Sequence, residues 1–249
     1  MAAMGAGSAS TALALGLLAG AALPLGAAAG AFLRLPERAV AGVMAFGAGT
    51  LIAALALVLM EDAHRHGGLI SAAAGFLAGA MLYTVADVAI KRFLGRRRRA
   101  AKHAEQSGMA IAFGSLVDNV PEGIVLGIGV IGAGGTSPAL LAAVILSNFP
   151  EALASAARMR EAGHRAPFIL GVWTAIGVLC GLAAWIGFLV FRTFSEQAVA
   201  LASAVAAGAI VAMLVDTLIP EAYEGAHDYS GLITAGGFLL AFALHKTTA

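Results

Sequence analysis

Two apolar segments of the chain carry the same polar pattern, Asn-x-Pro-Glu followed by a small residue. The first copy, in DNVPEG, contains Asn119 and Glu122, and the second, in SNFPEA, contains Asn148 and Glu151. Asn and Glu stand at i, i+3, and Asp118 stands at i, i+4 from Glu122, so on a helix these side chains share a face. Carboxylate and amide oxygens are typical ligands of divalent cations. The two copies therefore predict a cation site.

The prolines of the pattern add a second kind of acceptor. Pro121 and Pro150 have no backbone N–H, so the carbonyl groups of Val117 and Leu146 lose their helical donors. Such a proline also bends a helix. We therefore expect two bent, adjacent helices that present carboxylate, amide and carbonyl oxygens to one centre.

Composition decides where this site must lie. The 249 residues are 60% hydrophobic and 12% charged, which excludes an ordinary water-soluble domain. A carboxylate inside a membrane is costly and is a functional candidate, so Asp216, deep in a later apolar segment, is a possible hydrogen-bond acceptor or proton site beside the cations.

Asp87, four residues before Lys91, is interpreted as an i, i+4 ion pair. The only cysteine, Cys180, excludes an intramolecular disulfide framework.

Short polar breaks divide the chain into apolar segments of about the 20 residues that one membrane crossing needs. The segments cover residues 9–33, 39–61, 69–90, 108–131, 139–157, 167–191, 198–219 and 231–245. We expect an all-α, multi-pass transmembrane bundle of about eight helices, with residues 1–249 forming a single transmembrane transporter domain in the cell (inner) membrane. No Lys or Arg precedes the first segment, so we interpret it as a retained helix rather than a signal peptide.

The basic residues predict the orientation. Twelve of the 15 Lys and Arg residues lie in the first, third and fifth breaks, and only Arg65, Arg192 and Lys246 lie on the other side. Cytoplasmic loops carry the excess of Lys and Arg, so both termini are expected outside the cytoplasm. The run Arg96–Arg99 is interpreted as part of this signal beside anionic lipid, and no nucleic-acid partner is expected.

At the two Asn-x-Pro-Glu copies the chain resembles the ZIP family of divalent metal transporters, particularly its short bacterial members, whose fourth and fifth helices carry His-Asn-x-Pro-Glu-Gly. The likeness extends to eight helices, outside termini, a basic loop after the third helix and the run 215–220. It implies a transporter that moves zinc, manganese, iron or similar ions toward the cytoplasm. It also implies a binuclear metal site between helices four, five and six, and a homodimer. The metal is cargo, and no cofactor is implied.

The chain departs from the family pattern at several positions. Asp118 and Ser147 stand where His is usual, Thr217 stands where Glu is frequent, and a Glu expected in the sixth helix has its counterpart near Gly177. Imidazole suits zinc, whereas carboxylate, amide and water favour manganese, magnesium and calcium. The remaining oxygen ligands predict broader or harder cation selectivity than that of a typical zinc transporter.

The sequence also bears on two other function classes. An intramembrane enzyme would carry a His-Glu-x-x-His helix, paired catalytic aspartates in a Gly-Asp context, or a serine with a membrane histidine. The sequence has none of these motifs. No enzymatic activity is therefore expected. The other class is a ZIP-like protein that has lost metal transport and acts as a regulator or carries another small solute. The missing histidines favour it, and the retained Pro-Glu pairs oppose it.

Overall fold

The described chain consists of helices and short connections. The computed structural model describes residues 7–33, 35–100, 108–131 and 137–248, without the side chains of residues 93–100, 108–114, 117, 118 and 248. Within these ranges there is no strand, in agreement with the all-α prediction. The helices are α1 (Ala9–Gly20), α2 (Ala22–Phe32), α3 (Glu37–Ala54), α4 (Glu61–Ala100), α5 (Gly108–Gly129), α6 (Pro138–Glu161), α7 (Ala166–Phe191), α8 (Glu196–Met213), α9 (Ile219–Ala226) and α10 (Ser230–Thr248). Two π-helical turns, η1 (Leu55–Met60) and η2 (Leu214–Leu218), and the 3-10 turn η3 (His227–Tyr229) connect some of them.

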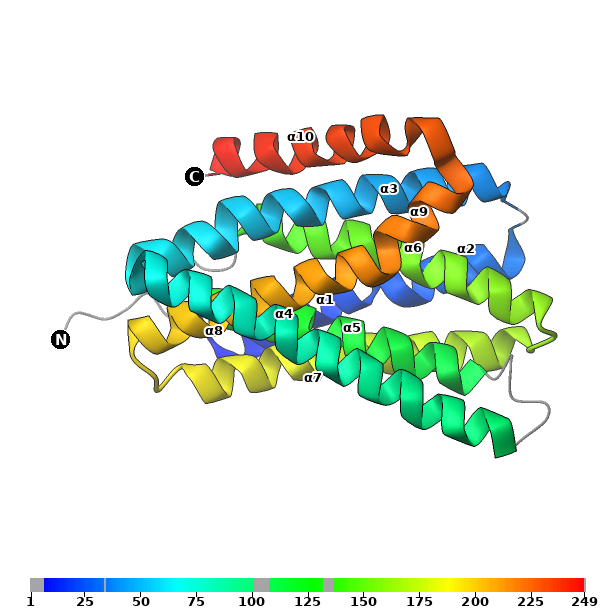
Figure 1. Ribbon diagram of the computed structural model, residues 1–249, viewed down its shortest axis with the longest axis horizontal. Helices are drawn as coiled ribbons and strands as arrows, with labels where there is room; N and C mark the ends of the chain where they lie inside the picture. The colour runs from blue at the N-terminus through cyan, green and yellow to red at the C-terminus, as the bar shows by residue number, and fades with distance from the viewer. Residues whose placement is uncertain (1–6, 34, 101–107, 132–136, 249) are drawn as a thin grey trace.

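Five helical segments of the described chain are long and apolar enough to cross a membrane. They are Ala9–Phe32, Glu37–Arg92, Pro138–Glu161, Ala166–Phe191 and Glu196–Thr247. Two of them have 56 and 52 residues, more than twice the roughly 20 that one crossing requires. Gly68, with φ 77°, and His227, with φ 42°, interrupt the helical backbone inside these two segments, and the chain turns back near both (Figure 1). The segments agree with the predicted membrane protein, and the count of eight crossings stays a prediction.

The helices pack in two groups. In the first group α6 packs on α2, and α7 packs on both α1 and α5. In the second group α4 packs on α8, and α3 packs on both α9 and α10. Between the groups α6 contacts α3 and α10, and α5 contacts α8. Both helices with the Asn-x-Pro-Glu pattern therefore belong to one group and lie against the other.

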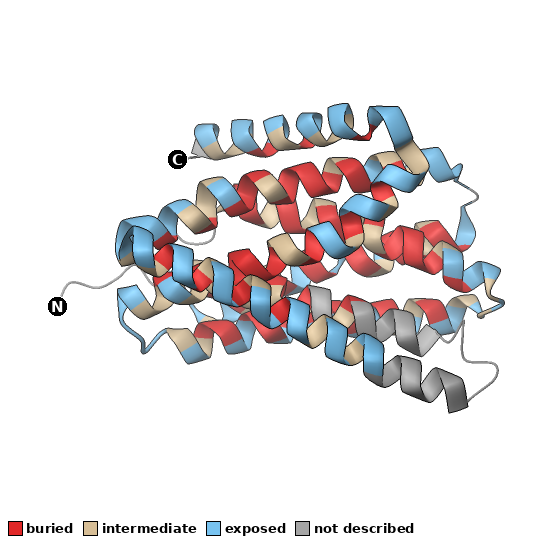
Figure 2. Cartoon of the chain, viewed as in Figure 1, coloured by how far each residue is buried: buried red, intermediate tan, exposed pale blue. Residues whose placement is uncertain are grey.

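The outer surface of the bundle is apolar. Buried residues lie on the helix sides that face one another, and exposed residues cover the outside (Figure 2). Large exposed side chains on α4 are Leu69, Ile70, Leu77, Met81, Leu82 and Val85. Water-soluble monomers rarely expose contiguous apolar surface of this extent, whereas the interior of a lipid bilayer is itself apolar.

The ends of the bundle agree with the predicted alternation of the breaks. The turns that follow α2 and α6 lie at one end, and the turn after α7 and the end of α10 lie at the other (Figure 1). At the first of these ends Arg158 of α6 pairs with Glu221 of α9, with Nη1 and Oε2 3.0 Å apart. The predicted ion pair of Lys91 and Asp87 is confirmed, at 2.6 Å between Nζ and Oδ2. Residues Arg34 and Lys102 and the side chains of Arg96–Arg99 are outside the description.

Candidate functional site

The two copies of the pattern meet between α5 and α6. The side-chain amide of Asn119 donates to the backbone carbonyl of Ser115, at 2.8 Å between Nδ2 and O. The same nitrogen donates to the carboxylate of Glu151, at 3.4 Å between Nδ2 and Oε1. Asn119 is buried and Glu151 is half-buried. The structure thus brings Asn119 of one copy into contact with Glu151 of the other, as expected for two helices that present polar side chains to one centre.

Asn148 extends this cluster toward α1. Its Nδ2 donates to the backbone carbonyl of Ala19 at 3.2 Å, and its side chain is completely buried. Pro24 has no N–H and leaves the next carbonyl, that of Gly20, without its helical donor, in the region where α1 ends and α2 begins. The contact from Asn148 to the first helix had no signal in the sequence.

The side-chain oxygens of Asn119 and Asn148 differ from the side-chain nitrogens in their hydrogen bonding. Oδ1 of Asn119 and Oδ1 of Asn148 are buried and have no hydrogen-bond partner in the described part of the chain, whereas both amide nitrogens are engaged. A buried acceptor without a partner costs about 1–3 kcal/mol. Each nitrogen therefore orients its side chain while the oxygen stays available for a cation or another electron-poor group.

The two glutamates supply negative charge beside these oxygens. Glu122 of α5 is 2% exposed, and it lies on the same helical face as Asn119. Cys180 of α7 is fully buried, and a Cβ atom at Gly123, next to Glu122, would lie 2.6 Å from its carbonyl oxygen. The backbone of α7 therefore packs directly on α5 beside Glu122. The sequence pattern did not include Cys180.

The prolines lie inside α5 and α6, as predicted. Only one of the two freed carbonyls has a described environment. The carbonyl oxygen of Leu146 faces Gly47 of α3, because a Cβ atom at Gly47 would lie 2.8 Å from it. This acceptor is therefore at the boundary with the second helix group. The hydroxyl of Ser147, where the resembled family has His, donates to the carbonyl of Val144 at 3.0 Å.

The remaining predicted residues are not joined to the cluster by any described contact. The side chain of Asp118 is outside the description. Asp216 is exposed in the π-helical turn η2, which packs on α3, α8 and α9. Next to it, Thr217 donates to the carbonyl of Met213 at 2.7 Å between Oγ1 and O. Among the described residues, no three His, Cys, Asp or Glu side chains are close enough to hold one metal ion.

The structure explains the missing acidic residue of the sixth predicted helix. A Cβ atom at Gly177 would lie 2.5 Å from the carbonyl oxygen of Gly20, and a Cβ atom at Gly20 would overlap the carbonyl oxygen of Gly177. The backbones of α7 and of the α1–α2 region are thus in direct contact. A carboxylate side chain at position 177 has no room in this packing.

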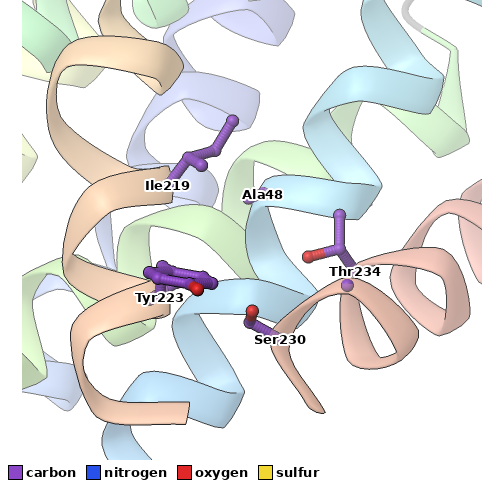
Figure 3. A pocket seen from close by; sticks show the side chains of 7 residues that line it. Ala48, Ile219, Tyr223, Ser230 and Thr234 are labelled. Atoms are coloured by element: carbon purple, nitrogen blue, oxygen red, sulfur yellow. The ribbon is translucent and has the colours of Figure 1, made fainter. Parts of the chain in front are cut away.

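A separate pocket lies at the surface between α3, α9 and α10. It has a volume of about 240 Å³ and is lined by Ala48, Ile219, Ala222, Tyr223, Ser230, Gly231 and Thr234. Figure 3 shows that Tyr223, Ser230 and Thr234 contribute its hydroxyl groups. The hydroxyl of Ser230 donates to the carbonyl of His227 at 2.8 Å. None of the lining residues belongs to the Asn–Glu cluster, so this pocket is distinct from the candidate site.

Comparison with known proteins gives no family for the chain. No protein-family model matches it, and no curated protein matches it.

Proposed function

We propose that this chain is a divalent metal cation transporter of ZIP type, which crosses the membrane eight times and carries ions toward the cytoplasm as a homodimer. The observation that carries the proposal is the pair of buried Asn119 and Asn148 oxygens without partners, beside Glu122 and Glu151. Two carboxylates and two amide oxygens suit a hard or borderline divalent cation, which they would hold with electrostatic and lone-pair contacts. Asp118 completes the proposed ligand set, and Asp216 is an accessory acceptor.

The two helix groups support a transport mechanism. The ligands lie on α5 and α6, which pack with α1, α2 and α7 in one group and contact the other group through α3, α8 and α10. Sliding of one group along the other would open the site first to one face and then to the opposite face.

Binding of metal to the purified full-length protein tests this proposal. Titration calorimetry with zinc, manganese, iron(II) and cadmium is expected to show saturable binding of at least one of them. Absence of binding for all four ions to well-folded protein would contradict it and would favour the second candidate, a ZIP-like regulator or carrier of another solute. The absence of a third close ligand among the described residues and the closed packing at Gly177 are the observations that favour that candidate.

Replacing Asn148 by Leu tests whether Asn148 is a metal ligand or only a structural residue. The variant removes a buried oxygen without a partner and also the hydrogen bond from Asn148 to the carbonyl of Ala19. These two effects on the free energy of unfolding have opposite signs and are each about 1 kcal/mol, so it is expected to stay within about 1 kcal/mol of the natural value. Metal affinity is expected to fall, because the amide oxygen is lost. Chemical unfolding and calorimetry on the same preparation measure both quantities.

The matched control is Ser203→Ala, which removes another buried polar side chain, on α8 rather than in the cluster. It should leave metal affinity unchanged. If Asn148→Leu strongly destabilises the protein and keeps its metal affinity, Asn148 serves only to tie α6 to Ala19.

A further inference from the structure

A polar face of α6 leads from the Asn–Glu cluster toward one end of the bundle. Glu151, Ser155 and Arg158 are spaced by four and three residues, so their side chains share one side of the helix. The other residues from 152 to 157 are Ala or Leu. Glu151 contacts Asn119 in the cluster, and Arg158 lies about 10 Å farther along the helix axis. The polar file therefore runs from the candidate site to the end that the basic residues predict to be cytoplasmic.

The guanidinium group at the end of this file is held by two partners. Nη2 of Arg158 donates to the hydroxyl of Ser155 at 3.3 Å, and Nη1 pairs with Oε2 of Glu221 at 3.0 Å. Ser155 belongs to the same helix, whereas Glu221 belongs to α9, in the second helix group. Both α6 and α9 pack on α3. The ion pair therefore joins the two groups across the boundary along which the proposed transport motion takes place.

We propose that Arg158 and Glu221 form a gate between the Asn–Glu cluster and the predicted cytoplasmic end, and that the pair separates each time an ion leaves. This inference rests on the proposed function, because it names the contact that has to open for release from the same site. While the pair is formed, the positive guanidinium repels a divalent cation that approaches along the file.

The exposure of the pair suits a contact that forms and breaks repeatedly. The side chains of Arg158 and Glu221 are 49% and 37% exposed, and ion pairs exposed to this degree contribute little to stability. Sliding of one helix group along the other can therefore break the pair at small cost. The ion pair of Lys91 and Asp87 differs, because both residues lie on α4 and no movement between the groups affects it.

Reversible cross-linking of positions 158 and 221 tests the gate. The variant is Arg158→Cys, Glu221→Cys with Cys180→Ala, so that the chain carries only the two introduced thiols. A bifunctional methanethiosulfonate reagent, added in detergent before reconstitution, ties the two groups together through two disulfides. Uptake of zinc, manganese, iron(II) or cadmium is expected to fall to the level of protein-free vesicles and to return after treatment with a membrane-permeant reductant. Calorimetric metal binding should persist, because the cluster is unchanged.

Two controls isolate the connection from the substitutions. The same variant treated with a monofunctional methanethiosulfonate carries the same modified positions without a link, and it should transport metal. The variant Asp87→Cys, Lys91→Cys with Cys180→Ala, treated with the bifunctional reagent, replaces an ion pair within α4 by a link within α4. It should transport at the rate of the Cys180→Ala protein.

An exchange of charges gives a second measurement that needs no link. Ser155 is 5% exposed, so the reaction of Ser155→Cys with a neutral maleimide, in the Cys180→Ala protein, reports opening of this end. Adding Arg158→Glu sets two carboxylates opposite each other and should raise the reaction rate up to about fivefold, the range that exposed ion pairs support. The exchange Arg158→Glu, Glu221→Arg should restore the slow reaction.

The results separate the gate from the function on which it rests. Uptake at the natural rate by the protein linked between positions 158 and 221 would overturn the gate and leave the transporter intact. An equal maleimide reaction of Ser155→Cys with and without Arg158→Glu would do the same. Failure of the natural protein to bind or take up any of the four metals would overturn both proposals. Recovery of uptake after reduction shows that the cross-linked protein is folded.

Discussion

Proteoliposomes that contain the variant Glu122→Ala, Glu151→Ala are expected to take up divalent metal no faster than protein-free vesicles. The variant removes two of the three carboxylates of the proposed ligand set. Asp118 alone, with the neutral amide oxygens of Asn119 and Asn148, cannot offset the cost of dehydrating a divalent ion in a low-dielectric interior. The measurement is uptake of zinc, manganese, iron(II) and cadmium by the natural and variant proteins at equal reconstitution.

The control variant is Glu224→Ala, Asp228→Ala, which also removes two carboxylates, both of them exposed. It is expected to transport at the natural rate, so a loss caused by changed net charge alone would be visible. Full uptake by the Glu122→Ala, Glu151→Ala variant would place the transport pathway elsewhere. The metal ranking of the natural protein tests the selectivity argument in the same experiment.

Gly177→Ala is expected to lower the free energy of unfolding by about 1–3 kcal/mol, the usual cost of forcing an extra carbon into a filled interior. The new Cβ would lie 2.5 Å from the carbonyl oxygen of Gly20. The atom in the way belongs to the backbone, so no side-chain rotation relieves the overlap, and α7 has to move away from α1. Unfolding in detergent, followed by circular dichroism, measures the change.

Gly171→Ala is the matched control on the same helix, because a Cβ atom there would meet no other atom within 4 Å. It should be neutral or slightly stabilising, since Ala is the better helix former by about 0.5–1 kcal/mol. Equal stability of the two variants would contradict the close contact of α7 with Gly20. Gly177→Glu, which introduces the residue type expected at this place from the ZIP resemblance, should be more destabilising than Gly177→Ala.

The helical architecture and the central contact of the site followed from the sequence for physical reasons. Uninterrupted apolar residues leave the backbone no hydrogen-bond partners except its own, so they form helices in a membrane. The i, i+3 spacing of Asn119 and Glu122, repeated in Asn148 and Glu151, fixes a shared face on each helix. The structure confirms the contact between the two copies in the Asn119–Glu151 pair.

Other parts of the arrangement depend on contacts between distant segments, which a single sequence does not reveal. Asp216 was expected deep in an apolar segment, whereas in the π-helical turn its side chain is exposed. The close packing of α7 on α5 at Cys180 and Gly123 had no signal in the sequence.

The contact between Asn148 and Ala19 also constrains how the protein is made. The two residues are 129 positions apart, and at a synthesis rate of about 5–20 residues per second the first helix enters the bilayer roughly 6 to 26 s before its partner exists. During that interval the glycine face around Gly20 has no partner helix, because α7, which it later contacts, follows α6 in the chain. Assembly of α1 with α6 and α7 is therefore a late, post-insertion step. A helix that associates with the wrong neighbour in those seconds would block the site without any change in the residues that form it.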